Sequence, residues 1–391
     1  MKTRTSNPTA RLSAPALLLT VALAAACAQT ASPDPPAPGA DSLPPPGAAE
    51  EFRTDFTRHS VPYSELLSGG PPKDGIPAID APKYETVAET DSWLSDTEPV
   101  ILIRAGPEAR AYPVRILVWH EIVNDELGGL PLAVTYCPLC NTAIAFRRTH
   151  DGRTLDFGAT GRLRFSNLVM YDRQTETWWQ QADGRGIAGR YAGDRLRYHP
   201  APMVSWAEFK TAFPGGSILS RDTGHSRDYG RNPYIGYDAE GASPFLYSGP
   251  ETPSALPPMT RVLTLELGGE TVAYPYRILE ARRLILDRVD GRAVVVLWTP
   301  GTASPLDSDR VDQGRDVGSA RGFGAASDGQ PASLEWSDGA FQDRETGSLW
   351  DALGRAVSGP RKGALLEPLA AVDHFWFSWA AFKPETRIYG E

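Results

Sequence analysis

Short apolar runs, rich in β-branched residues and punctuated by Gly, Pro or Asp, recur through the chain from about residue 66 onward. Runs of this length and composition are typical of strands rather than of long helices. Clear examples are residues 100–103, 132–136, 284–286 and 293–298. Helical spacing is found mainly at residues 203–212 and 376–382. The pattern therefore predicts a mainly β fold with minor helices, in the β-rich α+β class.

The pattern of the first half of the chain recurs in the second half. Tyr112-Pro113 matches Tyr274-Pro275 at an offset of 274 − 112 = 162 residues, and the offset holds without a gap over the following stretch. A period this long is too great for a solenoid and is typical of a pseudo-symmetric pair of domains. We predict two repeat units packed together, a first unit at residues 66–240 and a second, degenerate unit at residues 241–391.

A hairpin in the second unit sets the strand register for both. Asp290-Gly291 lies between two apolar runs, and Asp-Gly is a strong signal for a two-residue hairpin turn. Carried back by the offset, the turn falls on Gly128-Gly129, and His120 then faces Cys137. Directly opposed residues have Cβ atoms about 4.5–5.5 Å apart on one face of the sheet. A slip of one residue would move His120 to the other face.

Residues 120–140 concentrate soft-ligand chemistry. Cys137 and Cys140 form a C-x-x-C, and the predicted hairpin places the His120 imidazole beside them. Two thiolates and an imidazole suit Cu(I), whereas with a carboxylate or water they suit Zn. Met170 or Glu121 would supply a further ligand. We therefore expect a copper site, with zinc as the alternative, and leave open whether the protein is an enzyme that uses the metal for redox chemistry.

The second unit serves as an internal comparison for these ligands. It keeps the surrounding Tyr-Pro, Arg-Ile-Leu and Asp but loses the soft side chains. At the positions of His120, Glu121, Cys137 and Cys140 it has Arg282, Arg283, Thr299 and Thr302. Residues needed only for folding would be needed in both copies, so their confinement to one copy favours a functional role.

Two other interpretations of the cysteines stay open. A thiol-disulfide oxidoreductase would use Cys137 to attack and Cys140 to resolve, and this hypothesis requires a lowered pKa at Cys137. A structural disulfide would leave the protein a non-enzymatic envelope binding module. Its ligand cleft would then be formed by the polar, aromatic loop between the units, through Tyr229, Asn232 and Tyr234. A closed four-residue loop stabilises by only about 2 kcal/mol, which weighs against a purely structural role.

The N-terminus has the features of an export signal. Basic residues precede an apolar run at residues 14–26 that is too short to span a bilayer. The run ends at Cys27, so residues 1–26 are expected to be a lipoprotein-type signal peptide and Cys27 the lipidated residue, with ordinary Ala-x-Ala cleavage as the competing interpretation. Residues 27–65, rich in Pro and Ala, are expected to be a disordered tether. The mature protein is then exported to the cell envelope or periplasm and anchored to a membrane by its lipid.

Charge excludes one large class of partner. Removing the three N-terminal basic residues leaves 36 basic and 48 acidic side chains, a net charge of −12. No run of Lys and Arg supplies the clustered basic face that phosphate binding needs, so we expect no nucleic-acid partner. The residues do not identify a small-molecule or protein partner.

Several separated motifs occur in an order that resembles the bacterial domain-of-unknown-function 3179 (DUF3179) family. They are Tyr112-Pro113, residues 120–125, residues 134–140, Phe157-Gly158, residues 168–173 and residues 228–234. The resemblance covers about residues 70–391 and implies a domain extent rather than an activity. Where the family pattern has glycine after the second cysteine, this chain has Asn141.

Overall fold

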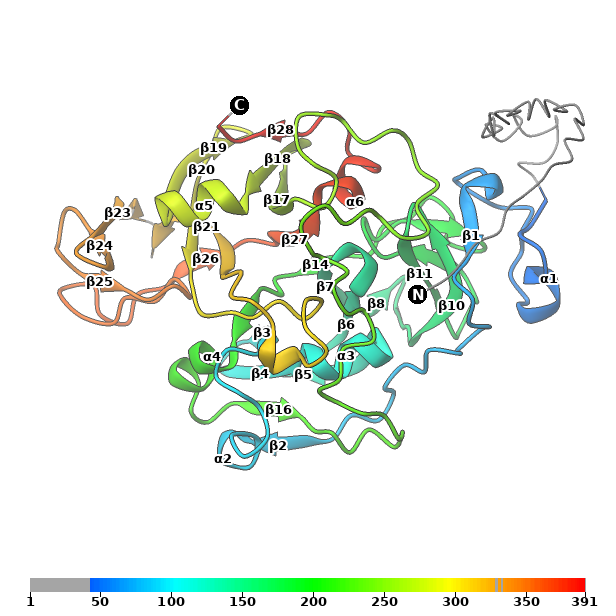
Figure 1. Ribbon diagram of the computed structural model, residues 1–391, viewed down its shortest axis with the longest axis horizontal. Helices are drawn as coiled ribbons and strands as arrows, with labels where there is room; N and C mark the ends of the chain where they lie inside the picture. Colours follow the sequence, from blue (N-terminus) through cyan, green and yellow to red (C-terminus); the bar gives the residue numbers. More distant parts are fainter. Residues whose placement is uncertain (1–42, 328–329, 332, 391) are drawn as a thin grey trace, which may run out of the picture. The chain divides into compact units, whose positions relative to one another are not determined.

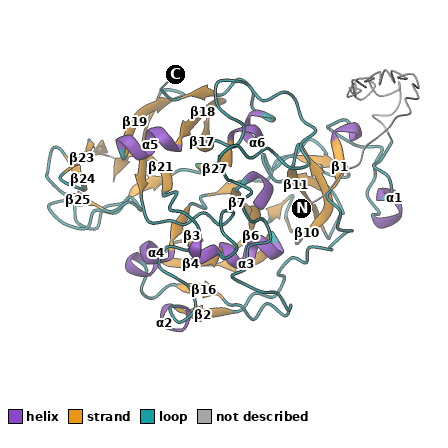
Figure 2. Cartoon of the chain, in the orientation of Figure 1, coloured by secondary structure: helices purple, strands orange, loops and turns teal. Residues whose placement is uncertain are grey.

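The computed structural model describes residues 43–327, 330–331 and 333–390. The predicted signal peptide and Cys27 lie outside these residues. Strands account for 40% of the structure and helices for 13%, so the predicted mainly β class is confirmed. Figure 2 shows how short the helices are beside the strands. Within the described residues, no helix has the length and apolar character needed to cross a membrane.

The first half of the chain contributes three larger sheets. One has the order β15 (Met203–Ser205), β3 (Pro99–Ala105), β4 (Glu108–Pro113), β16 (Ser217–Leu219), β2 (Tyr84–Thr86). The next has the order β14 (Tyr198–His199), β7 (Thr142–Arg147), β6 (Leu130–Cys137), β5 (Ile122–Leu127). The third has the order β1 (Leu66–Ser68), β10 (Phe157–Arg164), β11 (Asn167–Asp172), β12 (Trp178–Gln180), β13 (Gly186–Ala188). A small hairpin pairs β8 (Thr149–His150) with β9 (Arg153–Thr154).

The second half of the chain contributes the sheets formed by strands β17 to β28 (Figure 1). One has the order β27 (Val372–Phe375), β17 (Arg261–Leu267), β18 (Glu270–Pro275), β28 (Arg387–Ile388). Another has the order β19 (Leu284–Val289), β20 (Arg292–Thr299), β21 (Ser319–Ser327), β22 (Gln330–Pro331), and β26 (Leu366–Pro368) also pairs with β21. The last is β23 (Leu334–Ser337), β24 (Ala340–Asp343) and β25 (Leu349–Trp350).

The helices are short and connect or end these strands. The α-helices are α1 (Ala48–Glu51), α2 (Val87–Thr90), α3 (Val114–His120), α4 (Trp206–Ala212), α5 (Tyr276–Arg282) and α6 (Trp376–Ala380). The 3-10 turns are η2 (Tyr63–Glu65), η3 (Pro138–Cys140) and η4 (Val311–Gln313). The predicted helix at 203–212 starts late because Met203–Ser205 pair with β3 as β15. Ser205 and Glu208 then form a capping box that begins α4.

Two series of five elements run in the same order. The strands and helix β3, β4, α3, β5 and β6 have 7, 6, 7, 6 and 8 residues, and β17, β18, α5, β19 and β20 have the same lengths. The hairpin register is as predicted, because Asp125 pairs with Leu132 and Asp287 with Val294. The division into two repeat domains stays a prediction, and residues 38–391 cluster as one unit.

The predicted strand around His120 is wrong. Residues 114–120 form α3, which follows Pro113 and buries Ile116, Leu117 and nearby apolar side chains in the core. The spacing of their apolar residues is compatible with a short helix as well as with a strand. Pro113, with φ of −59°, is the N-cap of the helix. The strand pairing therefore begins only at Ile122, which faces Thr135.

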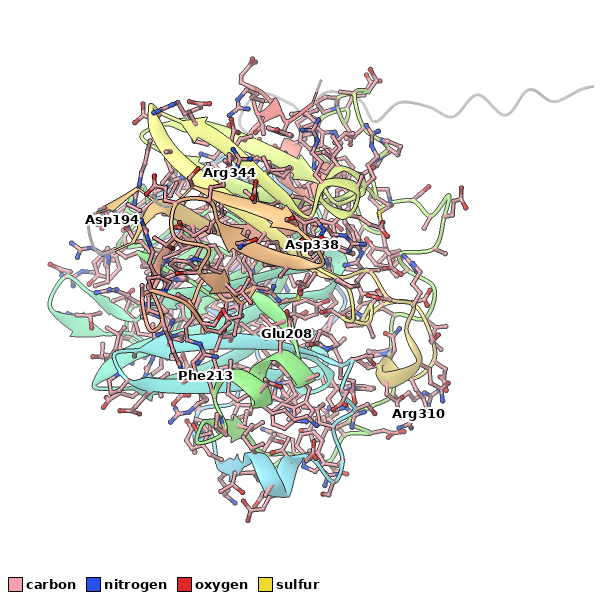
Figure 3. The ribbon with its side chains drawn as sticks, turned by 90° about the vertical axis from the view of Figure 1, so that its left-hand side faces the viewer. Asp194, Glu208, Phe213, Arg310, Asp338 and Arg344 are labelled. Atoms are coloured by element: carbon pink, nitrogen blue, oxygen red, sulfur yellow. The ribbon has the colours of Figure 1, made fainter. Side chains whose placement is uncertain are left out.

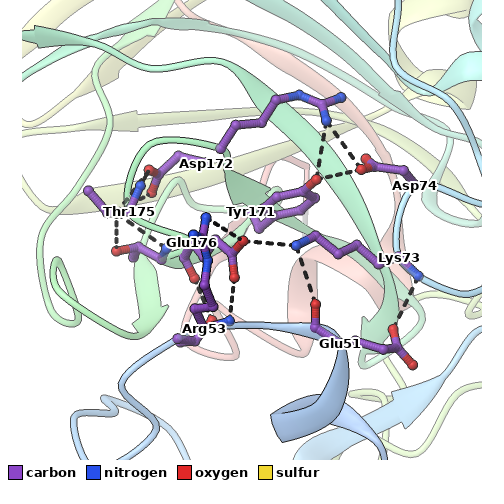
Figure 4. Close-up of polar contacts among 11 residues, drawn as sticks. Glu51, Arg53, Lys73, Asp74, Tyr171, Asp172, Thr175 and Glu176 are labelled. Atoms are coloured by element: carbon purple, nitrogen blue, oxygen red, sulfur yellow. Dashed lines mark hydrogen bonds and ion pairs between the residues drawn. The ribbon is translucent and has the colours of Figure 1, made fainter.

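The folded body extends upstream of Leu66. Phe52 and Tyr63 are buried with Trp178 in one core cluster. Polar contacts hold the same segment, as Figure 4 shows: Arg53 Nη2 lies 3.5 Å from Glu176 Oε1. This part of the predicted tether packs because its aromatic residues bury enough apolar surface to offset the entropy of ordering it.

Candidate functional site

The two cysteines lie on a buried turn between β6 and β7. Cys137 ends β6, Pro138 opens the one-turn helix η3, and Cys140 closes it. Asn141 follows with φ of 50°, in the left-handed region that Asn tolerates better than most residues, and its side chain accepts a hydrogen bond from Tyr136 OH at 3.1 Å. This accounts for Asn in place of glycine. Cys137 and Cys140 are 1% and 0% exposed.

Both sulfur atoms point at one backbone oxygen. Ser166 O lies 3.4 Å from Cys140 Sγ and 3.9 Å from Cys137 Sγ. The two cysteines are free thiols, so the structural disulfide is not present in this structure. Phe165 and Ser166 both have positive φ, 53° and 67°, without a glycine. Strained backbone of this kind is concentrated at functional sites, and here it accompanies the carbonyl that the thiols approach.

A buried amide network positions a donor at one sulfur. Asn167 Nδ2 lies 3.3 Å from Cys140 Sγ and donates to Gln181 Oε1 at 2.9 Å. Gln181 Nε2 in turn donates to Thr135 Oγ1 at 3.1 Å. Sequence reasoning missed Ser166, Asn167 and Gln181, because β11 and the segment after β12 reach the cysteines only through the fold. The amides hold the Asn167 N–H toward Cys140 Sγ.

His120 does not join the cysteines. Its Nδ1 lies 2.7 Å from Pro77 O and its Nε2 lies 2.6 Å from Tyr229 OH. A carbonyl only accepts, so Nδ1 carries the proton and Nε2 accepts from the tyrosine hydroxyl. Burial lowers the His120 pKa to about 4, with a further contribution from the nearby charges of His225 and Arg227. The predicted pairing of His120 with Cys137 is therefore wrong, because α3 ends at His120 and turns the imidazole elsewhere.

Glu121 is electrostatically coupled to the cysteines. It is 7% exposed, and burial raises its pKa to about 8. Burial also raises the pKa of Cys137, with further contributions from its hydrogen bond to Cys140 and the charges of Cys140 and Glu121. The lowered thiol pKa that the oxidoreductase hypothesis requires is not found. Across the described residues, no three or more His, Cys, Asp or Glu side chains are grouped to hold a metal ion.

The loop between the two halves covers this site. Tyr229 contacts His120, and Tyr237 OH donates to Leu139 O at 3.0 Å within the cysteine turn. The Tyr234 ring packs against the core cluster that contains both cysteines. Asn232 has a different role, because its amide donates to Ser308 O at 2.9 Å and anchors the loop to the second half. The loop residues thus divide between covering the site and holding the loop.

Met170 and His374 are also tied to the cysteine turn. Met170, considered above as a further ligand, is fully buried and packs in the core cluster that contains Cys137 and Cys140. His374 Nδ1 lies 2.8 Å from Thr142 Oγ1, and that hydroxyl lies 3.1 Å from Cys140 O. The contact joins segments more than 200 residues apart, so nothing local in the sequence indicates it.

Tyr229→Phe is expected to destabilise the protein by about 1–3 kcal/mol, since it leaves the buried His120 Nε2 without a donor. Urea unfolding followed by tryptophan fluorescence measures the change. Thr223→Val is the matched control, because it removes a hydroxyl that contacts Tyr229 from its other side and leaves the bond to His120 in place. Equal losses in the two variants would contradict the assigned role of the Tyr229 hydroxyl.

Comparison with curated proteins gives no match, and comparison with solved structures gives none either. Comparison with family models gives a match to the family described as protein of unknown function (DUF3179), over residues 73–386. The matched region contains the cysteine turn, His120, Glu121 and the covering loop. The chain therefore belongs to the DUF3179 family of proteins of unknown function.

Proposed function

We propose that this chain is an exported, lipid-anchored protein that binds one Cu(I) ion through the sulfur atoms of Cys137 and Cys140. The observation that carries the proposal is the convergence of both thiols on Ser166 O, at 3.4 and 3.9 Å. Cys137 and Cys140 also hydrogen-bond to each other through their side chains, so the two sulfurs are close enough to share one ion. Export and anchoring rest on the sequence of residues 1–27.

The donor set fits Cu(I) better than Zn. Thiolates are the soft ligands that Cu(I) prefers, and this ion is stable with two of them. Structural zinc sites take four protein ligands, and catalytic ones take three. The described residues bring two sulfurs together and leave His120 bonded to Pro77 and Tyr229. The copper proposal therefore keeps the cysteines of the predicted site and omits its histidine.

The groups around the two cysteines affect how readily the thiols give up their protons to bind a metal ion. Metal binding releases the thiol protons, so the raised pKa of Cys137 sets a cost that binding must offset. The Asn167 N–H lies within hydrogen-bond distance of Cys140 Sγ and can donate to that sulfur in the metal-bound state. Glu121, kept neutral by burial up to a pH of about 8, adds no negative charge beside the pair at neutral pH.

A dithiol redox role is the second candidate, favoured by the two adjacent free thiols. The raised pKa of Cys137 opposes it, because the thiolate is the attacking species in thiol-disulfide exchange. Titration of the pair against a glutathione series measures its potential. A value in the range of redox-active dithiols, about −120 to −270 mV, would favour this role over metal binding.

The copper proposal is tested by anaerobic titration of the reduced protein with Cu(I) in competition with a chromogenic chelator. The expected result is about one equivalent of tightly bound Cu(I), lost in Cys137→Ser and in Cys140→Ser. His120→Asn is the matched control and is expected to keep the full equivalent. X-ray absorption on the loaded protein should show sulfur neighbours alone.

Binding of less than about 0.1 equivalent by correctly folded wild-type protein would overturn the proposal. A nitrogen neighbour of the copper, together with loss of binding in His120→Asn, would restore the three-ligand site predicted from the sequence. Circular dichroism of each variant shows whether a loss of binding reflects a loss of fold.

A further inference from the structure

A cavity separate from the cysteine turn lies between the two halves of the chain. Its volume is about 190 Å³, and its wall combines Leu102, Pro200, Pro202 and Phe323 with the polar side chains discussed below. The segments that form it come from β3, β7, β14 and β21, so both halves contribute. In Figure 3, Glu208 marks the helix α4 beside it and Phe213 the residue that follows the helix, between the cyan strands of the first half and the yellow and orange strands of the second. The space equals that of about six water molecules.

The polar side chains in the wall are all basic. They are Arg104, Arg147, His199 and Arg321, and no Asp or Glu lines the cavity. Arg321 is paired with Glu208 of α4. Among the described residues, neither Arg104 nor Arg147 has a side-chain hydrogen bond or an ion pair with a carboxylate. Two guanidinium groups therefore remain available for a ligand at this cavity.

The charged form of Arg104 is disfavoured by its surroundings. Its guanidinium lies 5.5 Å from the ring centre of Phe213. Burial and the like charge of Arg355 lower its pKa, and the charge of Asp351 offsets part of this lowering. An anion beside Arg104 would relieve both effects. Arg147 is exposed at the cavity margin, where a guanidinium can meet a carboxylate with two parallel hydrogen bonds.

Two further polar atoms of the wall lack partners. His199 Nε2 donates to Arg104 O at 2.8 Å, and this leaves His199 Nδ1 buried without a hydrogen bond. Arg321 Nε is also buried and unpaired. Buried polar atoms without partners are uncommon in native proteins, and these two belong to residues that line the same cavity.

We propose that this cavity binds a small monocarboxylate with an apolar body, about the size of benzoate. The carboxylate would lie at Arg104 and Arg147, and the apolar body against Leu102 and Phe323. An apolar wall of this extent disfavours inorganic phosphate, which has no apolar part to bury. This binding activity is independent of the copper site, since no residue of the cysteine turn lines the cavity.

Isothermal titration calorimetry with benzoate, benzamide and inorganic phosphate tests the proposal. Benzoate is expected to bind at least about tenfold more tightly than either of the others, because only it combines charge with an apolar ring. Arg147→Met should weaken benzoate binding by about tenfold. Arg190→Met is the matched control, since it removes one exposed arginine that does not line the cavity, and it should leave the affinity unchanged.

Four results would overturn the proposal. They are equal affinities for benzoate and benzamide, tighter binding of phosphate than of benzoate, an equal effect of Arg147→Met and Arg190→Met, and no benzoate binding at millimolar concentration. Arg147 is exposed, so its replacement is expected to leave the fold intact.

Discussion

In the metal-free wild type, the free energy of unfolding is expected to fall by up to about 5 kcal/mol as pH rises from about 4.5 to about 8, and Glu121→Gln is expected to abolish this fall. Burial raises the Glu121 pKa from 4.5 to about 8. Within this window the unfolded chain releases the proton while the folded protein retains it, so rising pH favours unfolding. The stabilising contribution of the protonated Glu121 carboxyl is fully present below about pH 4.5 and is lost as pH rises through about 8. Glutamine has no proton to release and removes this pH dependence.

The measurement is urea unfolding of both proteins at a series of pH values from 4 to 9. Glu98 and Asp373, whose pKa values burial raises to about 6, titrate in the same range but in both proteins. The difference between the two curves therefore isolates Glu121. The two groups beside it, Cys137 and Tyr234, have raised pKa values and stay protonated throughout. Parallel curves for wild type and variant would show that Glu121 is ionised in the folded protein.

The hairpin register could be predicted from the sequence because its causes are local. Asp290-Gly291 fixes the turn, the alternation of apolar residues fixes the face, and the offset of 162 carries both to the first half. At the start of the hairpin, the two halves of the chain make the same backbone hydrogen bond at positions 162 residues apart. Tyr136 N donates to Glu121 O at 2.8 Å, and Trp298 N donates to Arg283 O at 2.9 Å.

The site was predicted only in part because the element before the hairpin is a helix. Extending the strand register back by two residues gave His120 as the partner of Cys137. In the structure Glu121 ends the helix with φ of 57°, and the imidazole goes to Pro77 and Tyr229 instead. Propensity over seven residues did not distinguish a helix from a strand here.

The remaining partners of the cysteines could not be found from local pattern. Ser166 and Asn167 approach Cys140 through the pairing of β10 with β11, and His374 approaches through β27. Nothing in the apolar run around Asn167 marks its amide as a neighbour of a thiol. Such contacts depend on how separate sheets pack, which the spacing of residues in one segment does not encode.

Asp125→Ala is expected to destabilise the protein by about 3–5 kcal/mol, more than the equivalent change in the second half. The Asp125 carboxylate accepts hydrogen bonds from Tyr84 and Tyr112 and lies 2.7 Å from Arg110 Nη1. Its side chain is 3% exposed and that of Arg110 is 10% exposed. Alanine would therefore leave a buried guanidinium without its counter-ion and two tyrosine hydroxyls without their acceptor.

Asp287→Ala provides the matched comparison at the same position of the second series. Asp287 accepts from Tyr274 OH at 2.9 Å and lies 2.9 Å from Arg387 Nη2, whose side chain is 39% exposed. Water can solvate Arg387 once the carboxylate is removed, so the expected loss is about 1–2 kcal/mol. Urea midpoints of the two variants, measured at neutral pH and in low salt, give the difference. Equal losses would show that solvent exposure does not determine how much the tyrosine, aspartate and arginine cluster contributes to stability. A larger loss for Asp287→Ala would show that the exposed cluster contributes more to stability than the buried one.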